Sequence, residues 1–325
     1  MRIFVCGGTG FIGRHVVEAL LERGDEVLVI TRRLPPSPVT RRNPKLRYAT
    51  WRDWAAHPEE WGRADGIVNL AGETINQRWT KDAKQRILQS RTQTAQWIAD
   101  TLPRMPEPPR VVVNASGVAI YGHTYSTGED DLMFDESAPP YPQDFLGQVT
   151  VAWEQAADAI AAERVVKLRL GLVLDRKDGV FPMLARTYRW LVGGRFGNGR
   201  QGFPWIHIQD VVGLILFCLE RPEISGPVNA VAPEPVTANQ FGRTLGRVLD
   251  RPHWFHVPGW LARMALGERS VLLLTGQLAR PRKALEAGYT FRFPTLRMAL
   301  RDLTRRSRDT GKVRRLDDES GQLNM

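Results

Sequence analysis

Short apolar runs alternate with longer amphipathic stretches along the first half of the chain. Runs rich in β-branched residues and bounded by turn residues predict strands, and apolar residues at three- and four-residue spacing predict helices. The predicted strands cover residues 3–6, 26–30, 46–50, 65–71, 110–115 and 165–170, and the predicted helices cover residues 11–23, 79–102 and 144–164. This alternation predicts an α/β fold in which a doubly wound parallel sheet carries helices on both faces.

The regular alternation ends near residue 175, where a smaller C-terminal mixed lobe is expected to begin. We expect residues 1–174 plus 203–231 to form the sheet domain, residues 175–202 plus 232–303 to form a substrate-binding lobe, and residues 304–325 to form a flexible tail of basic and acidic residues. Asp210 is expected to cap a helix over residues 211–221, and Thr237 a helix that runs to Leu249, because Asp and Thr are favoured N-caps.

The first predicted strand leads directly into a glycine-rich turn, Gly7 to Gly13, and then into the first predicted helix. Glycines at a strand-to-helix turn permit a tight turn, close approach of a pyrophosphate to the backbone, and close packing of helix on strand. The free N–H groups of such a helix favour an anion. The turn therefore predicts a dinucleotide site, the alternative being an ordinary turn.

Thr31, Arg32 and Arg33 follow the second predicted strand. A protein that prefers NAD usually has an acidic residue there, which binds the ribose 2′-hydroxyl. Two guanidinium groups instead suit a 2′-phosphate, which they can bind with paired hydrogen bonds. We therefore predict NADP(H) as cofactor; the alternative is that Arg32 and Arg33 are solvated surface charges.

The bulk composition narrows the class of protein further. The chain has 325 residues, 42% of them hydrophobic and 25% charged, which is ordinary for a globular protein. Its net charge of +10 is mostly dispersed, so we expect no nucleic-acid partner. Without a span-length apolar run, zinc spacing or a signal peptide, we expect no membrane partner, no metal and a cytoplasmic location, with Cys6 and Cys218 as buried thiols.

Several motifs together resemble the extended, epimerase-type branch of the short-chain dehydrogenase/reductase superfamily. The opening Gly-Gly-Thr-Gly-Phe-Ile-Gly is typical of that branch. Within it, the chain resembles the uncharacterised "epimerase family protein" group, also named putative NAD-dependent epimerase/dehydratase. The motifs that carry this resemblance are Asn69 to Glu73, Arg78-Trp79, Ser90-Arg91, Arg169 to Leu174, Phe203 to Ile208 and Gly226 to Asn229.

The resemblance implies a Rossmann fold that binds NADP(H), and it implies particular cofactor contacts. Carried onto this sequence, these are Gly7, Gly10, Phe11, Ile12 and Gly13 at the pyrophosphate, Thr31 and Arg32 at the adenosine ribose phosphate, Leu70 and Ala71 after the fourth strand, Arg91 on the long helix, and Val173 near the nicotinamide.

The catalytic machinery departs from the superfamily pattern. That pattern has a Tyr and, four residues later, a Lys on the helix after the fifth strand, with a Ser or Thr after that strand. The Tyr transfers the proton and the Lys lowers its pKa. Ser116 is present, but the segment from Phe145 to Thr150 contains neither Tyr nor Lys.

Other residues could replace the missing pair. Besides Ser116, which we favour as functional, the candidates are Glu73, whose alternative role is a loop cap, and Tyr121, for which packing as a loop aromatic is favoured, with Tyr125 nearby. For His207 and Asp210 structural roles are favoured. Two functions stay open. The first is an NADP-dependent oxidoreductase or epimerase acting on a small polar molecule, such as a sugar derivative. The second is a catalytically weak NADP(H)-binding module with a regulatory or redox-sensing role. The sequence does not fix the oligomeric state.

Overall fold

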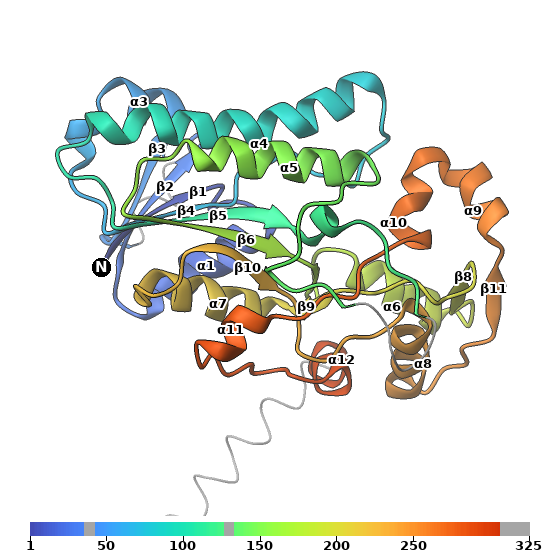
Figure 1. Ribbon diagram of the computed structural model, residues 1–325. Coiled ribbons are helices and arrows are strands. Elements are labelled where there is room, and N and C mark those ends of the chain that lie inside the picture. The colour runs from blue at the N-terminus through green and yellow to red at the C-terminus, as the bar shows by residue number, and fades with distance from the viewer. Residues whose placement is uncertain (36–42, 127–132, 306–325) are drawn as a thin grey trace, which may run out of the picture.

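The computed structural model describes residues 1–35, 43–126 and 133–305 (Figure 1). The tail predicted from residue 304 lies outside the described residues from residue 306 onward, and so does most of the proline-rich segment after Arg33. Within the described residues, none of the helices combines the length and apolar character needed to cross a bilayer.

Seven parallel strands form the central sheet. They are β1 (Arg2–Cys6), β2 (Glu26–Thr31), β3 (Leu46–Thr50), β4 (Gly66–Asn69), β5 (Val111–Gly117), β6 (Arg164–Leu170) and β10 (Gly226–Ala230), in the spatial order β10-β6-β5-β4-β1-β2-β3. The chain order reverses between β1 and β4, where Cys6 pairs with Ile30 on one side and Asn69 on the other. The predicted doubly wound parallel sheet is therefore confirmed.

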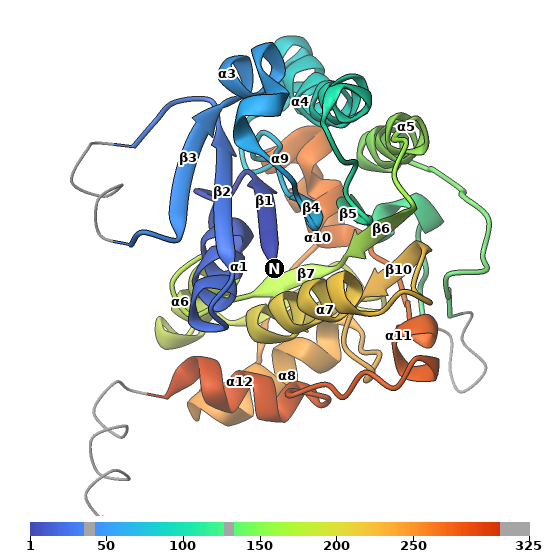
Figure 2. The same ribbon diagram turned by 90° about the vertical axis from the view of Figure 1, so that its left-hand side faces the viewer.

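Helices cover both faces of this sheet (Figures 1 and 2). One face carries α1 (Phe11–Glu22) and α7 (Ile208–Glu220), and the other carries α3 (Trp51–Ala56), α4 (Lys81–Thr101) and α5 (Phe145–Asp158). Strand residues alternate between two cores: Val5 packs toward the α1/α7 side, whereas Phe4 packs toward the α3/α4/α5 side. Because both faces are buried, the middle residues of β1, β2, β4 and β5 are mainly apolar, whereas β6 also contains Lys167 and Arg169.

A smaller lobe lies beyond the carboxyl ends of the strands (Figure 1). Its core includes Phe181, Tyr188, Trp205 and Phe241. Its elements are β7 (Leu172–Leu174), α6 (Phe181–Arg189), β8 (Gly194–Phe196), β9 (Trp205–His207), α8 (Ala238–Leu249), β11 (Phe255–Val257), α9 (Gly259–Leu266), α10 (Val271–Leu274) and α12 (Leu296–Thr304). The short helix α11 (Arg282–Glu286) instead packs on the sheet, where Ala284 joins the α1/α7 core.

Of four sequence predictions about single elements, two are confirmed, the cap of α8 and the return of β10 to the sheet, and two are wrong, the end of α5 and the placement of β9. Thr237 caps α8 as predicted, and its side chain accepts a hydrogen bond from the Gln240 backbone. The helix predicted over residues 144–164 ends at Asp158. Of the segment expected to return to the sheet, β10 does so, but β9 pairs with β7 in a separate two-stranded sheet. The proposed division into domains stays a prediction.

The role predicted for Asp210 as a helix cap is wrong. Helix α7 begins at Ile208, and His207 caps it by accepting a hydrogen bond from the Gln209 backbone at 3.1 Å. Asp210 lies buried in the first turn and accepts hydrogen bonds from the backbone N–H groups of Arg292 (2.6 Å) and Phe293 (3.0 Å). Its carboxylate therefore anchors a segment distant in sequence, which local cap preference does not reveal.

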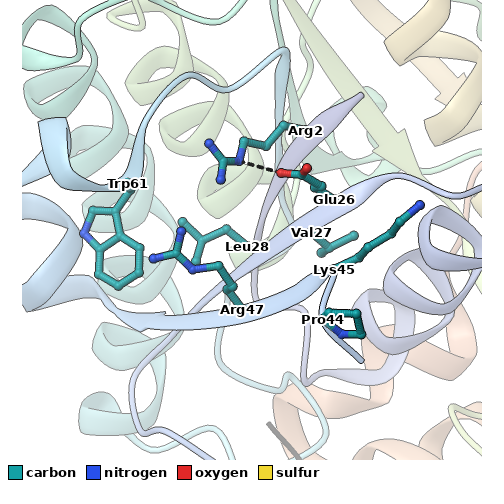
Figure 3. Close-up of a pocket in the computed structure, with 8 residues that line it drawn as sticks. All are labelled: Arg2, Glu26, Val27, Leu28, Pro44, Lys45, Arg47 and Trp61. Atoms are coloured by element: carbon teal, nitrogen blue, oxygen red, sulfur yellow. Dashed lines mark ion pairs between the residues drawn. The ribbon is translucent and has the colours of Figure 1, made fainter. Parts of the chain in front are cut away.

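A small cavity lies at the amino ends of the strands, opposite the lobe (Figure 3). Arg2, Glu26, Lys45, Arg47 and Trp61 are among its lining residues, and its volume is about 30 Å³. That volume accommodates about one water molecule. Because ligands of doubly wound sheets bind at the carboxyl ends of the strands, we look for the functional site at the other edge.

The anchoring role of Asp210 predicts a large effect of its removal. Asp210→Ala leaves two buried N–H groups without their acceptor, so we expect the free energy of unfolding to fall by about 2–4 kcal/mol. Urea denaturation followed by circular dichroism measures this. The exposed Asp100 provides the control, since Asp100→Ala should change stability by less than about 0.5 kcal/mol. Equal effects of the two substitutions would contradict the anchoring role.

Candidate dinucleotide-binding site

The turn between β1 and α1 requires glycine at two positions. Gly7 has a φ of +78°, and a Cβ atom there would lie 2.9 Å from the backbone of Ala71. A Cβ atom at Gly13 would collide with the carbonyl oxygen of Gly7. These glycines therefore let the turn, the first turn of α1 and the loop after β4 approach each other without intervening side chains.

The amino end of α1 opens at this turn. Gly10 is the N-cap, has an extended backbone and provides no side-chain hydrogen bond. Thr9 and Gly10 are exposed, and Phe11 and Ile12 are partly exposed. Because the first N–H groups of a helix have no intrahelical acceptor, those of Phe11, Ile12 and Gly13 suit the oxygens of a pyrophosphate. The cradle thus fits the group that the sequence predicts.

Basic side chains follow β2 at the same sheet edge. Thr31 is buried, and its hydroxyl donates a hydrogen bond to the carbonyl oxygen of Arg33 at 3.2 Å. Arg32 and Arg33 are exposed. The positive charge of Arg32 contributes to a lowered pKa of Glu73, after larger contributions from hydrogen bonds of Gln77 and Arg86. The charge of Arg32 is therefore felt at the loop after β4, along the same carboxyl edge.

Buried amides hold the loop after β4. The side chains of Asn69 and Asn114, on neighbouring strands, share a hydrogen bond of 2.7 Å. The Asn69 oxygen also accepts from the backbone N–H of Ala71 at 3.3 Å, and the N–H of Leu70 donates to the Cys6 carbonyl at 2.9 Å. Leu70 and Ala71 are thereby fixed against the glycine turn.

Arg91, which the resemblance assigns to the cofactor, supports this loop from α4. Its guanidinium donates to the carbonyl oxygens of Glu73 and Ile87, both at 3.0 Å, and lies 5.2 Å from the ring of Trp153. Burial lowers the pKa of Arg91 to about 10, so it remains charged at neutral pH. The structure thus shows Arg91 bound to the loop itself.

The strand β7 brings Val173 to the amino end of α1. A Cβ atom on Gly179 would lie 3.1 Å from both the Phe11 ring and the carbonyl oxygen of Val173. Phe11 and Val173 therefore border the same small space. The structure consequently gathers the predicted cofactor residues from five separate segments along one edge of the sheet.

Ser116 and Tyr121, two of the three predicted catalytic residues, belong to a buried polar network. The Ser116 hydroxyl donates to Glu154 Oε1 at 2.7 Å, and Glu154 forms two hydrogen bonds with Arg169, at 2.8 and 2.9 Å. Arg169 also donates to the Tyr121 hydroxyl at 2.7 Å. Tyr121 in turn donates to Asn229 Oδ1 at 2.8 Å.

The network has the properties of a structural element. Ser116, Tyr121, Glu154 and Arg169 are at most 6% exposed. Burial alone would lower the pKa of Arg169, but the hydrogen bonds of Glu154 raise it above its ordinary value. Burial raises the pKa of Tyr121, against the charge of Arg169. All the charges are paired, as buried charges must be.

Sequence reasoning missed Glu154, Arg169 and Asn229. A signal was available, because Asn69, Asn114, Arg169 and Asn229 are polar residues in or at the carboxyl ends of otherwise apolar strands. Polar side chains at such positions are retained when they bind one another or a ligand.

Glu73, the third predicted catalytic residue, is more accessible. Its carboxylate accepts hydrogen bonds from Gln77 and Arg86, both at 3.1 Å, and its side chain is 23% exposed. The lowered pKa keeps this carboxylate ionised at neutral pH. It can accept a proton, whereas a protonated donor form is disfavoured.

The start of α5 contains no group that could replace the missing Tyr and Lys. The Thr150 hydroxyl donates to the Leu146 carbonyl at 2.7 Å, and the Phe145 ring packs on Trp79 with centroids 5.3 Å apart. A Cβ atom on Gly117 would lie 3.5 Å from the Thr150 hydroxyl. The surface next to the carboxyl end of β5 is therefore formed by small and apolar groups.

The weaker catalytic candidates His207 and Tyr125 make contacts within the fold. His207 is buried, and burial lowers its pKa to about 4 even though Asp302 Oδ2 lies 3.3 Å from its Nε2. Its ring packs against Phe293 with centroids 3.9 Å apart. Tyr125 is 45% exposed, and its hydroxyl lies 3.5 Å from the Leu274 carbonyl.

The sheet order and the glycine cradle at the switch point define a Rossmann-type protein of the dinucleotide-binding class. Residues 3–231 match the NAD dependent epimerase/dehydratase family, and residues 257–303 match a domain of unknown function, DUF1731. The chain belongs to the NAD dependent epimerase/dehydratase family, within the group of epimerase family proteins that includes YfhF and SDR39U1.

Individual relatives cover nearly the whole chain. The chain is 37% identical to epimerase family protein YfhF of Bacillus subtilis, over 93% of this chain and 98% of the relative. It is 36% identical to epimerase family protein SDR39U1 of Mus musculus, over 93% of this chain and 99% of that relative. Human SDR39U1, whose crystal structure contains NADPH, is 35% identical and superposes with a TM-score of 0.82, over 93% of this chain and 99% of that one.

The close approach at Gly7 predicts a strong effect of a single methyl group. Gly7→Ala combines a left-handed backbone with a collision against the Ala71 backbone, so we expect the free energy of unfolding to fall by about 2–4 kcal/mol. Gly24 is a matched control with a φ of +91°, where the nearest atom to an added Cβ is Lys45 Nζ at 3.6 Å. Gly24→Ala should cost only about 1 kcal/mol. Chemical denaturation of both variants tests this, and a larger cost at Gly24 would contradict it.

Proposed function

We propose that this chain binds NADP(H) along the carboxyl edge of the sheet and acts as an atypical oxidoreductase or epimerase on a small polar substrate, such as a sugar derivative. One observation carries the proposal: Arg32 and Arg33 are exposed at the edge where the amino end of α1 and the glycine turn meet. The NADPH in the human relative supports the same cofactor.

Each part of the cofactor has protein groups that suit it. The N–H groups of Phe11, Ile12 and Gly13 would bind the pyrophosphate, and the guanidiniums of Arg32 and Arg33 would bind the 2′-phosphate. The fixed loop of Leu70 and Ala71 would contact the middle of the cofactor, with Val173 near the nicotinamide. When bound, NADP(H) supplies a hydride donor or acceptor.

Glu73 is the residue we assign to proton transfer. Of Ser116, Glu73 and Tyr121, it is the one that combines an ionised group with a partly exposed side chain. The two hydroxyls are buried and hydrogen-bonded to other parts of the chain. In this proposal, Ser116 and Tyr121 contribute by keeping the carboxyl ends of β5, β6 and β10 in place.

A second function is favoured by the start of α5. Because Phe145, Leu146 and Thr150 transfer no proton and carry no charge, the bound cofactor could remain unreacted and act as a signal. The chain would then be a redox-sensing module that distinguishes NADPH from NADP⁺ and reports the difference through the lobe.

The cofactor assignment predicts a selective effect at Arg32. Arg32→Glu should weaken NADPH binding by at least about tenfold, because the 2′-phosphate loses a cation and meets an anion, and should change NADH binding by less than about threefold. Isothermal titration calorimetry measures both affinities. Arg110→Glu, at an exposed site before the amino end of β5 and thus at the opposite edge of the sheet, is the control and should change neither. Equal affinities of the unmodified protein for NADPH and NADH would contradict the assignment.

The two functions predict different results for catalytic variants. If the chain is an enzyme with Glu73 as its base, Glu73→Gln should lower kcat by about 100-fold or more at unchanged stability. Ser116→Ala should instead lower the free energy of unfolding by about 1–2 kcal/mol, because Glu154 loses a buried donor.

A panel of carbonyl and alcohol substrates with NADPH and NADP⁺ provides the assay. If the unmodified protein turns over no member of the panel and binds NADPH and NADP⁺ with different affinities, the sensing module replaces the enzyme. If it turns over none and binds both forms equally, with no change in shape by X-ray scattering, neither function stands.

A further inference from the structure

Several large apolar side chains are exposed on the lobe, outside the cofactor edge. Trp190 is 66% exposed, Trp254 and Met264 are each 72% exposed, and Trp260 is 65% exposed. Trp190 directly follows α6, Trp254 directly precedes β11, and Trp260 and Met264 lie on α9. Exposed apolar groups of this size commonly mark an interaction surface.

These residues come from separate segments that the fold brings together. The indole N–H of Trp254 donates to the Leu191 carbonyl at 2.8 Å, and the N–H of Phe255 donates to the Gly193 carbonyl at 3.2 Å. The parallel pair β8 and β11 continues this contact. Figure 1 shows β8, β11 and α9 together at the end of the lobe farthest from the amino ends of the sheet strands.

Arginines surround the same residues. Residues 183–200 contain no acidic residue, and residues 243–266 contain one, Asp250. Three arginines, Arg243, Arg247 and Arg251, and that one acidic residue, Asp250, line an open hollow of about 410 Å³ that reaches His253, next to Trp254. The Arg186 guanidinium lies 5.1 Å from the Trp190 ring. We call this surface the Trp/Arg face, and its exposed basic members are Arg186, Arg189, Arg243, Arg247, Arg251 and Arg263.

The composition of the Trp/Arg face favours one of three possible binding partners: a second copy of the chain, a single-stranded nucleic acid, or a lipid surface. A second copy of the chain would bring arginines opposite arginines, which costs free energy. Single-stranded nucleic acid would stack on the indoles, but it offers no counterpart to aliphatic Leu191, Val192 and Met264. A lipid surface accommodates indoles and aliphatic groups at its interface and attracts cations when its headgroups are anionic.

We infer that the Trp/Arg face docks this protein onto an anionic lipid surface, as a peripheral contact that crosses no bilayer. This inference goes beyond the proposed function and departs from the sequence expectation of no membrane partner. The arginines bind headgroup phosphates, while Trp190, Trp254, Trp260 and Met264 enter the headgroup region. The lobe thereby rests on the membrane by its outer end, with the cofactor edge on its other side.

Sedimentation of the full-length protein with vesicles tests the inference. We expect binding to vesicles that contain phosphatidylglycerol, weak binding to pure phosphatidylcholine, and release at high salt. Arg247→Glu combined with Arg251→Glu should lower the apparent affinity by at least about tenfold, and Trp260→Ser combined with Met264→Ser by a similar factor. The second pair avoids Trp254, whose indole bonds within the fold.

Control variants lie on the sheet domain: Arg52→Glu and Tyr141→Ser, at exposed positions, should bind vesicles as the unmodified protein does. Absence of binding to anionic vesicles, or binding unaffected by the Trp/Arg face variants, overturns the inference. The inference is also overturned if the protein binds a single-stranded oligonucleotide and the same variants lose that binding. It is likewise overturned if light scattering shows a dimer that these variants dissociate. NADPH affinity, measured in parallel, should stay unchanged and so separates this test from that of the proposed function.

Discussion

The structure depends on the contact between two backbones at the switch point of the sheet. Gly7 approaches Ala71 so closely that a Cβ atom added at Gly7 would lie only 2.9 Å from the Ala71 backbone. This contact sets the position of the amino end of α1 against the loop after β4. The loop is in turn fixed by the Asn69–Asn114 hydrogen bond and by Arg91. The amino end of α1 can offer its free N–H groups to a pyrophosphate only when these elements are held in this way.

The carboxyl edge is stiffened by polar groups that in other arrangements could react. Ser116, Glu154, Arg169 and Tyr121 form a continuous chain of short hydrogen bonds that ends on Asn229. Burying a charged pair costs desolvation energy that the pair must recover from its own contacts. The consequence is that three strands are tied together at their carboxyl ends, and that neither hydroxyl can donate its proton to a substrate without breaking a bond in the network.

The sequence predicted the sheet and the cofactor edge because both depend on local pattern. The apolar runs of β1 and β2, the glycines between β1 and α1, and the arginines after β2 are each contained within a few neighbouring residues. The failures concern contacts between distant segments. Asp is a residue type favoured at helix caps, but Asp210 instead accepts hydrogen bonds from the backbone of Arg292 and Phe293. Ser116 likewise contacts Glu154 only because α5 packs on the sheet. No local preference encodes such partners, which tertiary packing selects.

Exposed arginines occur in two different arrangements, one at the carboxyl edge of the sheet and one on the Trp/Arg face. The difference between the two arrangements favours two different ligands. Arg32 and Arg33 stand beside a rigid glycine cradle, where a few fixed donors match the oxygens of one phosphate group. The arginines of the Trp/Arg face are instead spread around indole and aliphatic groups over the outer end of the lobe. A dispersed array combined with apolar side chains cannot select a single small anion, but it matches a surface that offers many phosphates above an apolar layer. Under the two proposals, arginine therefore serves recognition of the cofactor at the carboxyl edge of the sheet and adhesion to lipid at the outer end of the lobe.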